Sequence, residues 1–239
     1  CSQSRGLGDV YKRQGITFSN DLVDTKDHSI FLYANYYGGA GVGIGDFDND
    51  GLDDIFLAAN LIDDKIYKNL GNFQFEDKTK LSGIINNGSW STGVTVADVN
   101  NDGLLDIYIS CELYDDAPFL RTNKLYINKG DFKFVESAKK WGVDVDRRTR
   151  HSVFFDYNND GLLDLYLLNH PPNTGNFSPF FGSDMTLPEY NLQLFENKGD
   201  HFVDVTEKAG LNRAGFPNAA VIGDFNKDGW ADIYVANDF

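Results

Sequence analysis

Residues 46–54 read Asp-Phe-Asp-Asn-Asp-Gly-Leu-Asp-Asp, and the rest of the chain is organised around this stretch. It places carboxylates at its first, third, fifth and ninth positions. A glycine stands at the sixth position, where a chain that wraps around an ion must turn sharply. Carboxylates this close repel one another unless a cation lies between them, and an all-oxygen cage suits Ca²⁺ better than Mg²⁺, which prefers to keep its waters. The stretch therefore predicts a calcium-binding loop.

The same pattern recurs three times with identical internal spacing. One acidic run with Asn and Gly is ordinary turn chemistry, but four matched copies are not expected by chance. The alternative is four solvated acidic turns that hold no metal. The predicted ligands, with the backbone carbonyl at position seven, are Asp46, Asp48, Asp50, Leu52 and Asp54 in loop 1; Asp98, Asn100, Asp102, Leu104 and Asp106 in loop 2; Asp156, Asn158, Asp160, Leu162 and Asp164 in loop 3; and Asp224, Asn226, Asp228, Trp230 and Asp232 in loop 4.

Two other calcium motifs are excluded. An EF-hand needs a bidentate Glu at position twelve and a helix on each side, whereas position twelve is apolar here and the flanks are strand-like. Thrombospondin-type repeats need regularly spaced cysteines, and the chain has 2 cysteines in 239 residues. The residues at position twelve are Leu57, Ile109, Leu167 and Val235.

The amino-acid composition indicates a globular protein with a packed core and excludes some classes of partner. A hydrophobic content of 41%, with 14% aromatic residues, is ample for a packed core. The formal net charge of -15 argues against nucleic acid or an anionic membrane surface as the partner, and much of this charge lies at the predicted ligand positions. No apolar run is long enough for a membrane span. Cys111 ends an apolar strand, where we expect a buried, inert thiol.

The chain is an internal repeat, and every unit has the same order of elements. A first apolar strand leads into the calcium loop, and a second follows it; both are apolar on both faces, which predicts burial between neighbouring sheets. A third strand, an Asn-x-Gly turn and a fourth strand alternate apolar and polar residues, which predicts one wet side. The expected strands are 42–44, 55–57, 66–67 and 73–75 in the first unit, 94–96, 107–109, 125–126 and 132–134 in the second, 153–155, 165–167, 194–195 and 202–205 in the third, and 221–222 and 233–235 in the fourth.

Four antiparallel strands per repeat, two inner and two outer, predict an all-β fold, a β-propeller with four-stranded blades. In such a blade the calcium loop and the Asn-x-Gly turn lie on one face of the disc. The connection from the second strand to the third lies on the opposite face.

The stretch Gly-Val-Gly-Ile-Gly-Asp-Phe-Asp-Asn-Asp-Gly-Leu-Asp-Asp-Ile-Phe (41–56) resembles the FG-GAP or VCBS repeat of integrin α-subunit propellers. The pattern Phe-x-Asp-x-Thr-x-x-Ala-Gly-Leu (202–211) is similar to bacterial proteins of the ASPIC/UnbV, cartilage-acidic-protein-like group. The resemblance implies a seven-bladed propeller that is secreted or surface-bound. Because only about four blades are present, we expect residues 15–239 to be a partial propeller, and residues 1–14 to be a non-native or disordered leader.

These observations predict a calcium-binding scaffold, extracellular, cell-surface or periplasmic, in which about four Ca²⁺ ions are structural. Its expected partner is a protein or carbohydrate on the face opposite the calcium loops. Two alternatives stay open: part of a secreted polysaccharide lyase or hydrolase, and a spacer that binds nothing itself. Catalysis would need a base or paired carboxylates outside the loops, and the scattered candidates form no motif. They are His28, His151, His170, His201, Glu112 and Glu189.

The partner site is predicted from the connections between the second and third strands. These connections differ most between repeats, and repeat proteins often confine insertions to their binding face. The longest runs from about residue 170 to 190 and is unusually rich in aromatic residues. The alternative is that these aromatics plug the central channel or cover a neighbouring blade. The predicted partner-binding residues are Phe177, Phe180, Phe181 and Tyr190.

Overall fold

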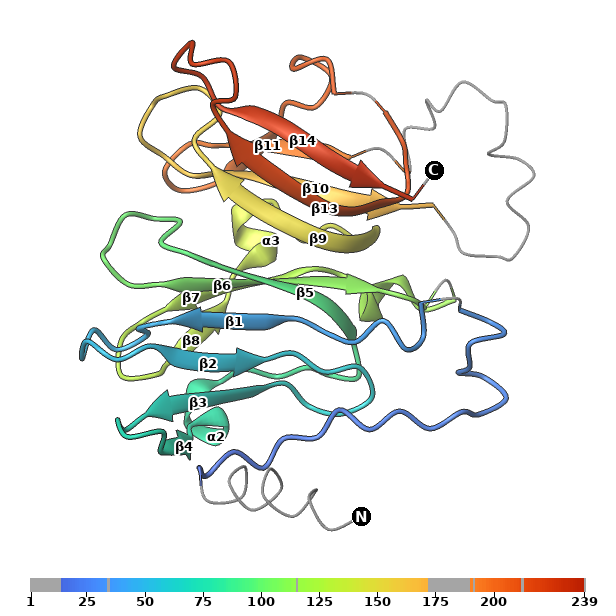
Figure 1. The fold of residues 1–239 in the computed structure, drawn as a ribbon, viewed down its shortest axis with the longest axis vertical. Coiled ribbons are helices and arrows are strands. Elements are labelled where there is room, and N and C mark those ends of the chain that lie inside the picture. The colour runs from blue at the N-terminus through green and yellow to red at the C-terminus, as the bar shows by residue number, and fades with distance from the viewer. Residues whose placement is uncertain are drawn as a thin grey trace.

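Strands account for nearly all of the regular structure in the computed structural model, which describes residues 14–33, 35–114, 116–171, 190, 192–211 and 213–238. They form three four-stranded antiparallel sheets, called blades 1 to 3 here, and a two-stranded sheet called blade 4 (Figure 1). The all-β prediction with four-stranded propeller-like blades is confirmed. Blade 1 holds β1 (Val42–Gly45), β2 (Asp54–Leu57), β3 (Lys65–Asn69) and β4 (Phe75–Asp77); blade 2 holds β5 (Trp90–Ala97), β6 (Asp106–Glu112), β7 (Lys124–Asn128) and β8 (Phe134–Glu136); blade 3 holds β9 (Arg148–Phe155), β10 (Asp164–His170), β11 (Gln193–Asn197) and β12 (Phe202–Asp204); and blade 4 holds β13 (Pro217–Gly223) and β14 (Asp232–Asn237).

Each sheet follows chain order, so every connection is an antiparallel hairpin. The predicted metal loops join the first and second strands of each blade, and all four lie on the left side of the molecule in Figure 1, the loop of blade 4 at the top left. The N-terminal segment before β1 and the connection from β6 to β7 lie at the right. The predicted division into two faces therefore holds in the fold.

The blades pack face to face through apolar clusters. Phe47 and Phe56 of blade 1 pack against Ile107 and Phe134 of blade 2, and all four side chains are buried. Equivalent clusters join blade 2 to blade 3 and blade 3 to blade 4. Burial of these large side chains, at about 1.5–3 kcal/mol each, is the main force that stacks the blades.

The expectation that the third strands have one wet side was wrong for β7 and β11, whereas β3 is half-buried at Lys65, Lys68 and Asn69. β7 and β11 are buried along almost their whole length. The reason is that a blade lies between two others: Tyr126 packs toward blade 1, while Leu125 and Ile127 pack toward blade 3. The fourth strands β8 and β12 are largely exposed, as predicted.

The inner strands also differ from the prediction, in β1 and in both strands of blade 4. β6 and β10 are buried on both faces as expected, but Val42 and Ile44 in β1 are 57% and 62% exposed. Their side chains line a cavity of about 600 Å³ that the first strands β1, β5 and β9 share, because first strands border the middle of the arc rather than a neighbouring sheet.

Two fourth strands begin later than predicted. Phe73 and Phe132 belong to the turn, not to the strand, because both have a left-handed φ of 57°. The preceding residues, Asn72 and Asp131, are left-handed as well. This pair of left-handed residues completes the hairpin, so β4 and β8 start two residues further on than the aromatic pattern indicated.

Two short helices in the links between blades were not predicted. They are α2 (Thr79–Ser82) and α3 (Ala138–Trp141), and a glycine with positive φ ends each. A 3-10 turn, η1 (Pro118–Leu120), lies between β6 and β7. α3 places Trp141 against Phe202 in the cluster between blades 2 and 3. Four residues are too few for a helical period to show in the sequence.

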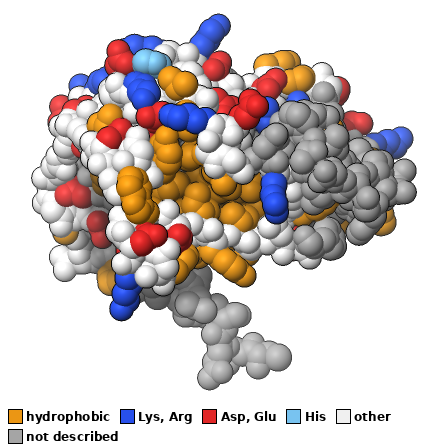
Figure 2. All heavy atoms as spheres, turned by 90° about the horizontal axis from the view of Figure 1, so that it is seen from above, with side chains coloured by type: hydrophobic (Ala, Val, Ile, Leu, Met, Phe, Trp, Pro, Cys, Tyr) orange, Lys and Arg blue, Asp and Glu red, His pale blue; other side chains and the backbone are white. Residues whose placement is uncertain are grey.

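Seen from the end that carries blade 4, hydrophobic side chains gather in the middle of the surface (Figure 2). Val221 and Tyr234, in β13 and β14 of blade 4, are exposed. Among the described residues, no helix has both the length and the apolar character that a membrane span requires.

Candidate metal sites

The position-one aspartate shapes each loop. In loop 1, Asp46 accepts the N–H of Asp50 on Oδ1 (3.0 Å) and the N–H of Gly51 on Oδ2 (2.7 Å). These two bonds hold the carboxylate of position one against the backbone of positions five and six, so the chain curls into a ring. Asp98, Asp156 and Asp224 accept the same two N–H groups in loops 2, 3 and 4.

Position four is a structural position that the sequence reasoning missed. Asn49, Asn101 and Asn159 have φ of 57°, 55° and 58°, in the left-handed region. Asn is the non-glycine residue that enters this region most easily, and the Asn at position four was the available signal. Lys227 takes the same conformation in loop 4.

Positions one, three and five come together in loop 1, and position seven bonds to position five. In loop 1, Asp48 and Asp50 join Asp46 in a cluster whose ligand oxygens all lie within 4.8 Å of one another. The N–H of Leu52 donates to Asp50 Oδ1 at 2.9 Å, which positions the residue predicted to offer its carbonyl. The position-seven residues Leu104, Leu162 and Trp230 make the same bond to their position-five aspartates.

Loops 2 to 4 carry Asn at position three. Asn100 accepts the N–H of Asp102 on Oδ1 (2.9 Å) and donates from Nδ2 to Asp102 Oδ2 (3.0 Å). An amide oxygen remains a hard donor suited to Ca²⁺, but it brings no charge. Asn158 and Asn226 donate to their position-five aspartates in the same way.

The position-nine aspartate is a buried clamp. Asp54 accepts the N–H of Phe47 on Oδ2 (2.9 Å) and the N–H of Asn69, at the end of β3, on Oδ1 (2.8 Å). The loop is thereby fastened to the third strand, and each oxygen keeps a second lone pair for a cation. Burial raises the pKa of Asp54 to about 6. Asp106 and Asp164 make the same pair of bonds, and burial raises their pKa values to about 7 and about 6.

Loop 1 fits a cation on one observation besides its donor set. Asp48 Oδ1 is a buried oxygen with no hydrogen-bond partner among the described residues. The ammonium of Lys68 lies against Asp48 and 2.7 Å from Asp50 Oδ2, so it offsets part of the negative charge of the predicted ligands.

Comparison with known proteins agrees with this geometry. A family model described as "FG-GAP-like repeat" matches residues 46–109 and 180–235, which together make up half of the chain. The chain belongs to the FG-GAP-like repeat family. It is also 24% identical, over 211 residues, to human cartilage acidic protein 1. The match covers 85% of this chain and 29% of that protein, so the chain spans less than a third of its relative's length.

Neighbouring loops of these FG-GAP-like repeats are joined directly. Asn49 Nδ2 donates to the carbonyl of Gly103, across 3.0 Å from loop 1 to loop 2. Asn159 Nδ2 donates to the carbonyl of Gly229, across 3.1 Å from loop 3 to loop 4. Both donors are position-four residues, so the left-handed Asn links one repeat to the next.

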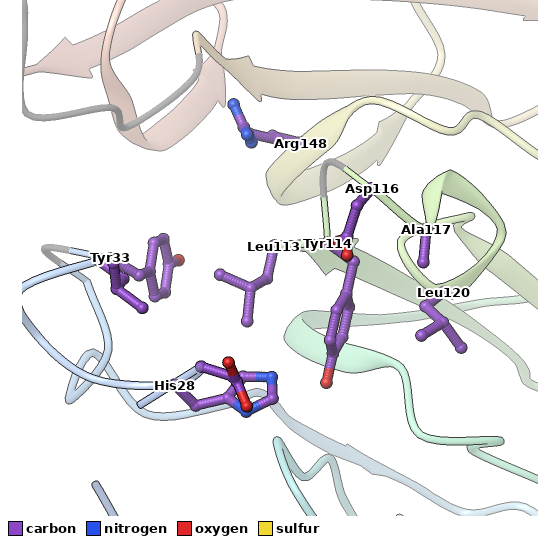
Figure 3. A pocket seen from close by; sticks show the side chains of 10 residues that line it. His28, Tyr33, Leu113, Tyr114, Asp116, Ala117, Leu120 and Arg148 are labelled. Carbon is purple, nitrogen blue, oxygen red and sulfur yellow. The ribbon is translucent and has the colours of Figure 1, made fainter. Parts of the chain in front are cut away.

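The face opposite the loops carries a pocket of about 490 Å³ (Figure 3). Tyr33 and His28 enter it from the N-terminal segment, and Leu113 and Tyr114 from the β6–β7 connection. Leu113 and Tyr114 have consecutive positive φ values of 70° and 44°, a strained arrangement of the kind found at ligand sites. Asp27, Asp116 and Arg148 add charged groups to its lining.

The predicted partner-binding residues are only partly described. Phe177, Phe180 and Phe181 lie outside the described residues, as does the catalytic candidate Glu189. Tyr190 is half-buried. The leader predicted over residues 1–14 also lies almost wholly outside the described part; Gln14 is described, and its carbonyl accepts the N–H of Phe75.

The remaining catalytic candidates lie in separate elements. His170 is buried at the end of β10, with a ring nitrogen 2.8 Å from the carbonyl of Pro217. His151 is in β9, and burial lowers its pKa. Glu112 is buried and accepts a hydrogen bond from Tyr33 (2.6 Å). His201 is an exposed side chain beside Asp200. Cys111 is a free, buried thiol, as expected, and burial raises its pKa to about 11.

Proposed function

We propose that this chain is a calcium-stabilised, extracellular binding scaffold in which each FG-GAP-like loop holds one Ca²⁺ ion. The observation that carries the proposal is that four loops repeat one hydrogen-bonded frame with oxygen donors at positions one, three and five. A fourfold repeat of the frame is difficult to explain as turn chemistry alone, because ordinary turns do not need clustered carboxylates.

Within this proposal the loops hold the ion through side-chain oxygens at positions one, three, five and nine and the carbonyl at position seven. When bound, Ca²⁺ supplies positive charge that offsets the repulsion between the carboxylates. The protein's own part is to hold the donors in place. Position one curls the loop and position nine fastens it to the third strand, so the role of the ion is to stabilise the fold.

The test is thermal and chemical unfolding with Ca²⁺ and with chelator. Extracellular calcium modules bind at roughly 10⁻⁴–10⁻³ M, so 10 mM Ca²⁺ should add about 1–3 kcal/mol of stability per occupied loop by mass action. Mg²⁺ at the same concentration is the control and should add much less. Coincident unfolding curves in Ca²⁺ and in chelator would reject the calcium proposal.

We further propose that a carbohydrate binds on the face opposite the loops, in the pocket between Tyr33 and Tyr114. A concave site with aromatic side chains and a few charged groups suits a small polar ligand better than a flat protein surface, which would need about 800 Å² per partner. A protein partner is the other outcome of the test.

This second proposal is tested with Tyr114→Ala on an array of glycans. Phe119→Ala is the matched control, because Phe119 lies on the same connection and is 76% exposed, outside the pocket lining. Loss of glycan binding in the first variant alone supports the proposal. Equal binding by both variants, or capture of a protein but no glycan, overturns it.

The competing function is a polysaccharide-active enzyme, and one observation bears on it. Asp27, Asp116 and His28 line the same pocket, so acid–base groups are present where a sugar would lie. Chain-length analysis of polysaccharides incubated with the protein and with its Asp116→Asn variant distinguishes the two functions. Cleavage that depends on Asp116 would favour the enzyme, and intact polysaccharide would favour the scaffold.

A further inference from the structure

One position on the third strand brings a different side chain to each calcium loop. It immediately precedes the Asn of the Asn-x-Gly turn. The registers are equivalent, since Tyr67 pairs with Ile55, Tyr126 with Ile107 and Phe195 with Leu165. The next residue along each strand is a cation in blade 1, an apolar residue in blade 2 and an anion in blade 3. These residues are Lys68, Ile127 and Glu196.

In loop 1 the side chain at this position reaches the predicted ligands. The ammonium of Lys68 bonds to Asp48 and to Asp50 Oδ2, and its side chain is 21% exposed. The same nitrogen lies 5.6 Å from the ring centre of Phe132, a cation–π contact from the next blade. Loop 1 therefore carries a positive charge of its own.

In loop 3 the equivalent side chain is a carboxylate. Glu196 is largely buried, and its Oε1 accepts hydrogen bonds from Asn158 Nδ2 at position three (3.3 Å) and from Lys198 Nζ (2.5 Å). It adds an acidic oxygen beside a position that is otherwise neutral, and the more exposed ammonium of Lys198 offsets part of its charge. In loop 2, Ile127 is buried in the apolar cluster between blades 2 and 3 and adds no charge.

We propose, on the basis of the calcium function proposed above, that this strand position sets the cation affinity of each loop. Lys68 makes loop 1 the weakest of the three sites and the least dependent on metal for its shape. Glu196 makes loop 3 the strongest. A unit charge changes the binding of a divalent cation at short range by about tenfold or more, so the three loops fill in the order 3, 2, 1 as Ca²⁺ rises.

A simpler role for Lys68 is to neutralise the extra carboxylate of loop 1. Asp48 stands where loops 2 and 3 have Asn, so the ammonium restores the net charge of loop 2. Charge balance alone would give loops 1 and 2 the same affinity. The contacts favour competition instead, because Lys68 bonds to both position three and position five, whose oxygens are needed by the ion.

The experiment is a Ca²⁺ titration of the full chain followed by ¹H–¹⁵N NMR. The amide groups of Gly51, Gly103 and Gly161 each donate to the position-one aspartate of their own loop, so each reports one site. We expect Gly161 to shift at the lowest Ca²⁺ concentration and Gly51 at the highest. Lys68→Met, which keeps the aliphatic stem, should lower the Gly51 midpoint about tenfold.

Two further variants complete the test. Lys65→Met is the matched control, because Lys65 lies in the same strand but pairs with Asp77, and it should leave all midpoints unchanged. Glu196→Gln should raise the Gly161 midpoint alone. Should Lys68→Met fold poorly, Lys68→Gln gives the same comparison.

Each outcome decides a separate point. If none of the glycine signals responds to Ca²⁺, the calcium function itself fails. If all three respond but Gly51 and Gly103 share one midpoint, or Lys68→Met leaves Gly51 unchanged, the calcium function stands and the role of Lys68 is overturned.

Discussion

Asn128 joins two neighbouring blades, because its Nδ2 lies 2.8 Å from the carbonyl oxygen of Phe47, 81 residues earlier in the chain. The same amide nitrogen donates to the carbonyl of Leu105 in loop 2 of its own blade (3.1 Å), while Oδ1 accepts the N–H of Gly130 in the turn (2.9 Å). Asn197 repeats this arrangement between blades 2 and 3, through the carbonyl of Val99 (2.9 Å). The Asn that the sequence predicts only as part of a turn is thus also a buried link between neighbouring blades.

Replacement of Asn128 by Ala should destabilise the protein by about 3 kcal/mol or more, because two buried carbonyls and one N–H lose their partner. Asn69→Ala is the comparison, since Asn69 is only half-buried and donates to the carbonyl of Asp53 in its own loop. Its loss should be about 1–2 kcal/mol. Urea unfolding of both variants measures the difference, and equal losses would show that the link between blades adds nothing.

The position-one and position-five aspartates should differ when no metal is present. Asp98→Ala removes the acceptor of two loop N–H groups, so we expect a loss of about 1–2 kcal/mol even in chelator. Asp102→Ala removes the acceptor of one exposed backbone N–H and of the exposed Asn100 side-chain amide, both of which water can satisfy, and should cost less than about 1 kcal/mol there. Both should lose the calcium response of loop 2 and keep that of the other loops. Equal unfolding curves for the two variants in chelator would contradict the structural role of position one.

The free energy of unfolding should depend on pH through Asp64, which lies outside the four predicted metal loops. It is buried, its Oδ1 accepts the N–H of Ala59 (2.8 Å) and the Nδ2 of Asn86 (3.0 Å), and burial raises its pKa from 3.8 to about 6. Because the folded state holds this proton more tightly than the unfolded state, ionisation of Asp64 costs stability as pH rises. Relative to Asp64→Asn, the wild type should lose about 3 kcal/mol between pH 4 and pH 6, and little more above that.

The measurement is the free energy of unfolding in chelator at several pH values, taken as the difference between wild type and Asp64→Asn. Titration of the other groups is common to both proteins and cancels in the difference. A difference that is flat across this range, or one that changes in the opposite direction, would show that Asp64 is ionised at little cost in the folded protein.

Gly41 is required by the close approach of blade 1 to blade 2. A Cβ on Gly41 would lie 2.5 Å from the backbone nitrogen of Val94 and 2.7 Å from the carbonyl carbon of Gly93. A Cβ on Gly43 would instead meet the Val94 and Val96 side chains, at 2.7 and 2.9 Å. We expect each Gly→Ala change to cost about 1–3 kcal/mol, with Gly41→Ala the more severe.

A second substitution separates the two cases. Val94→Ala should partly rescue Gly43→Ala, because it removes one of the clashing methyl groups. It should rescue Gly41→Ala less, because it removes Val94 Cγ2, which lies 2.8 Å from that Cβ, but leaves the closer backbone atoms of Val94 and Gly93 in place. A double-mutant cycle of thermal unfolding gives the coupling energy. Equal rescue of both variants would mean that the blades shift apart instead of clashing.

The sequence by itself determined the repeat, the strand order within a blade and the loops that form the candidate sites. These features are local: the spacing of Asp46, Gly51 and Asp54 specifies a turn, and alternating apolar strands specify hairpins. The division of the blade into two faces followed as well, because antiparallel neighbours alternate their connections. Nothing beyond each repeat was needed for these conclusions.

Tertiary structure decided what happens between repeats. Burial of both faces of β7, the bond from Asn128 to Phe47 and the contact of Lys68 with the ligands of loop 1 all depend on how blades and strands meet in space. The sequence predicts that Asn128 begins a turn and that Lys68 lies in a strand, and the structure agrees with both predictions. Their further partners lie up to 81 residues away, and only the packing of blade on blade brings such distant groups within hydrogen-bond distance.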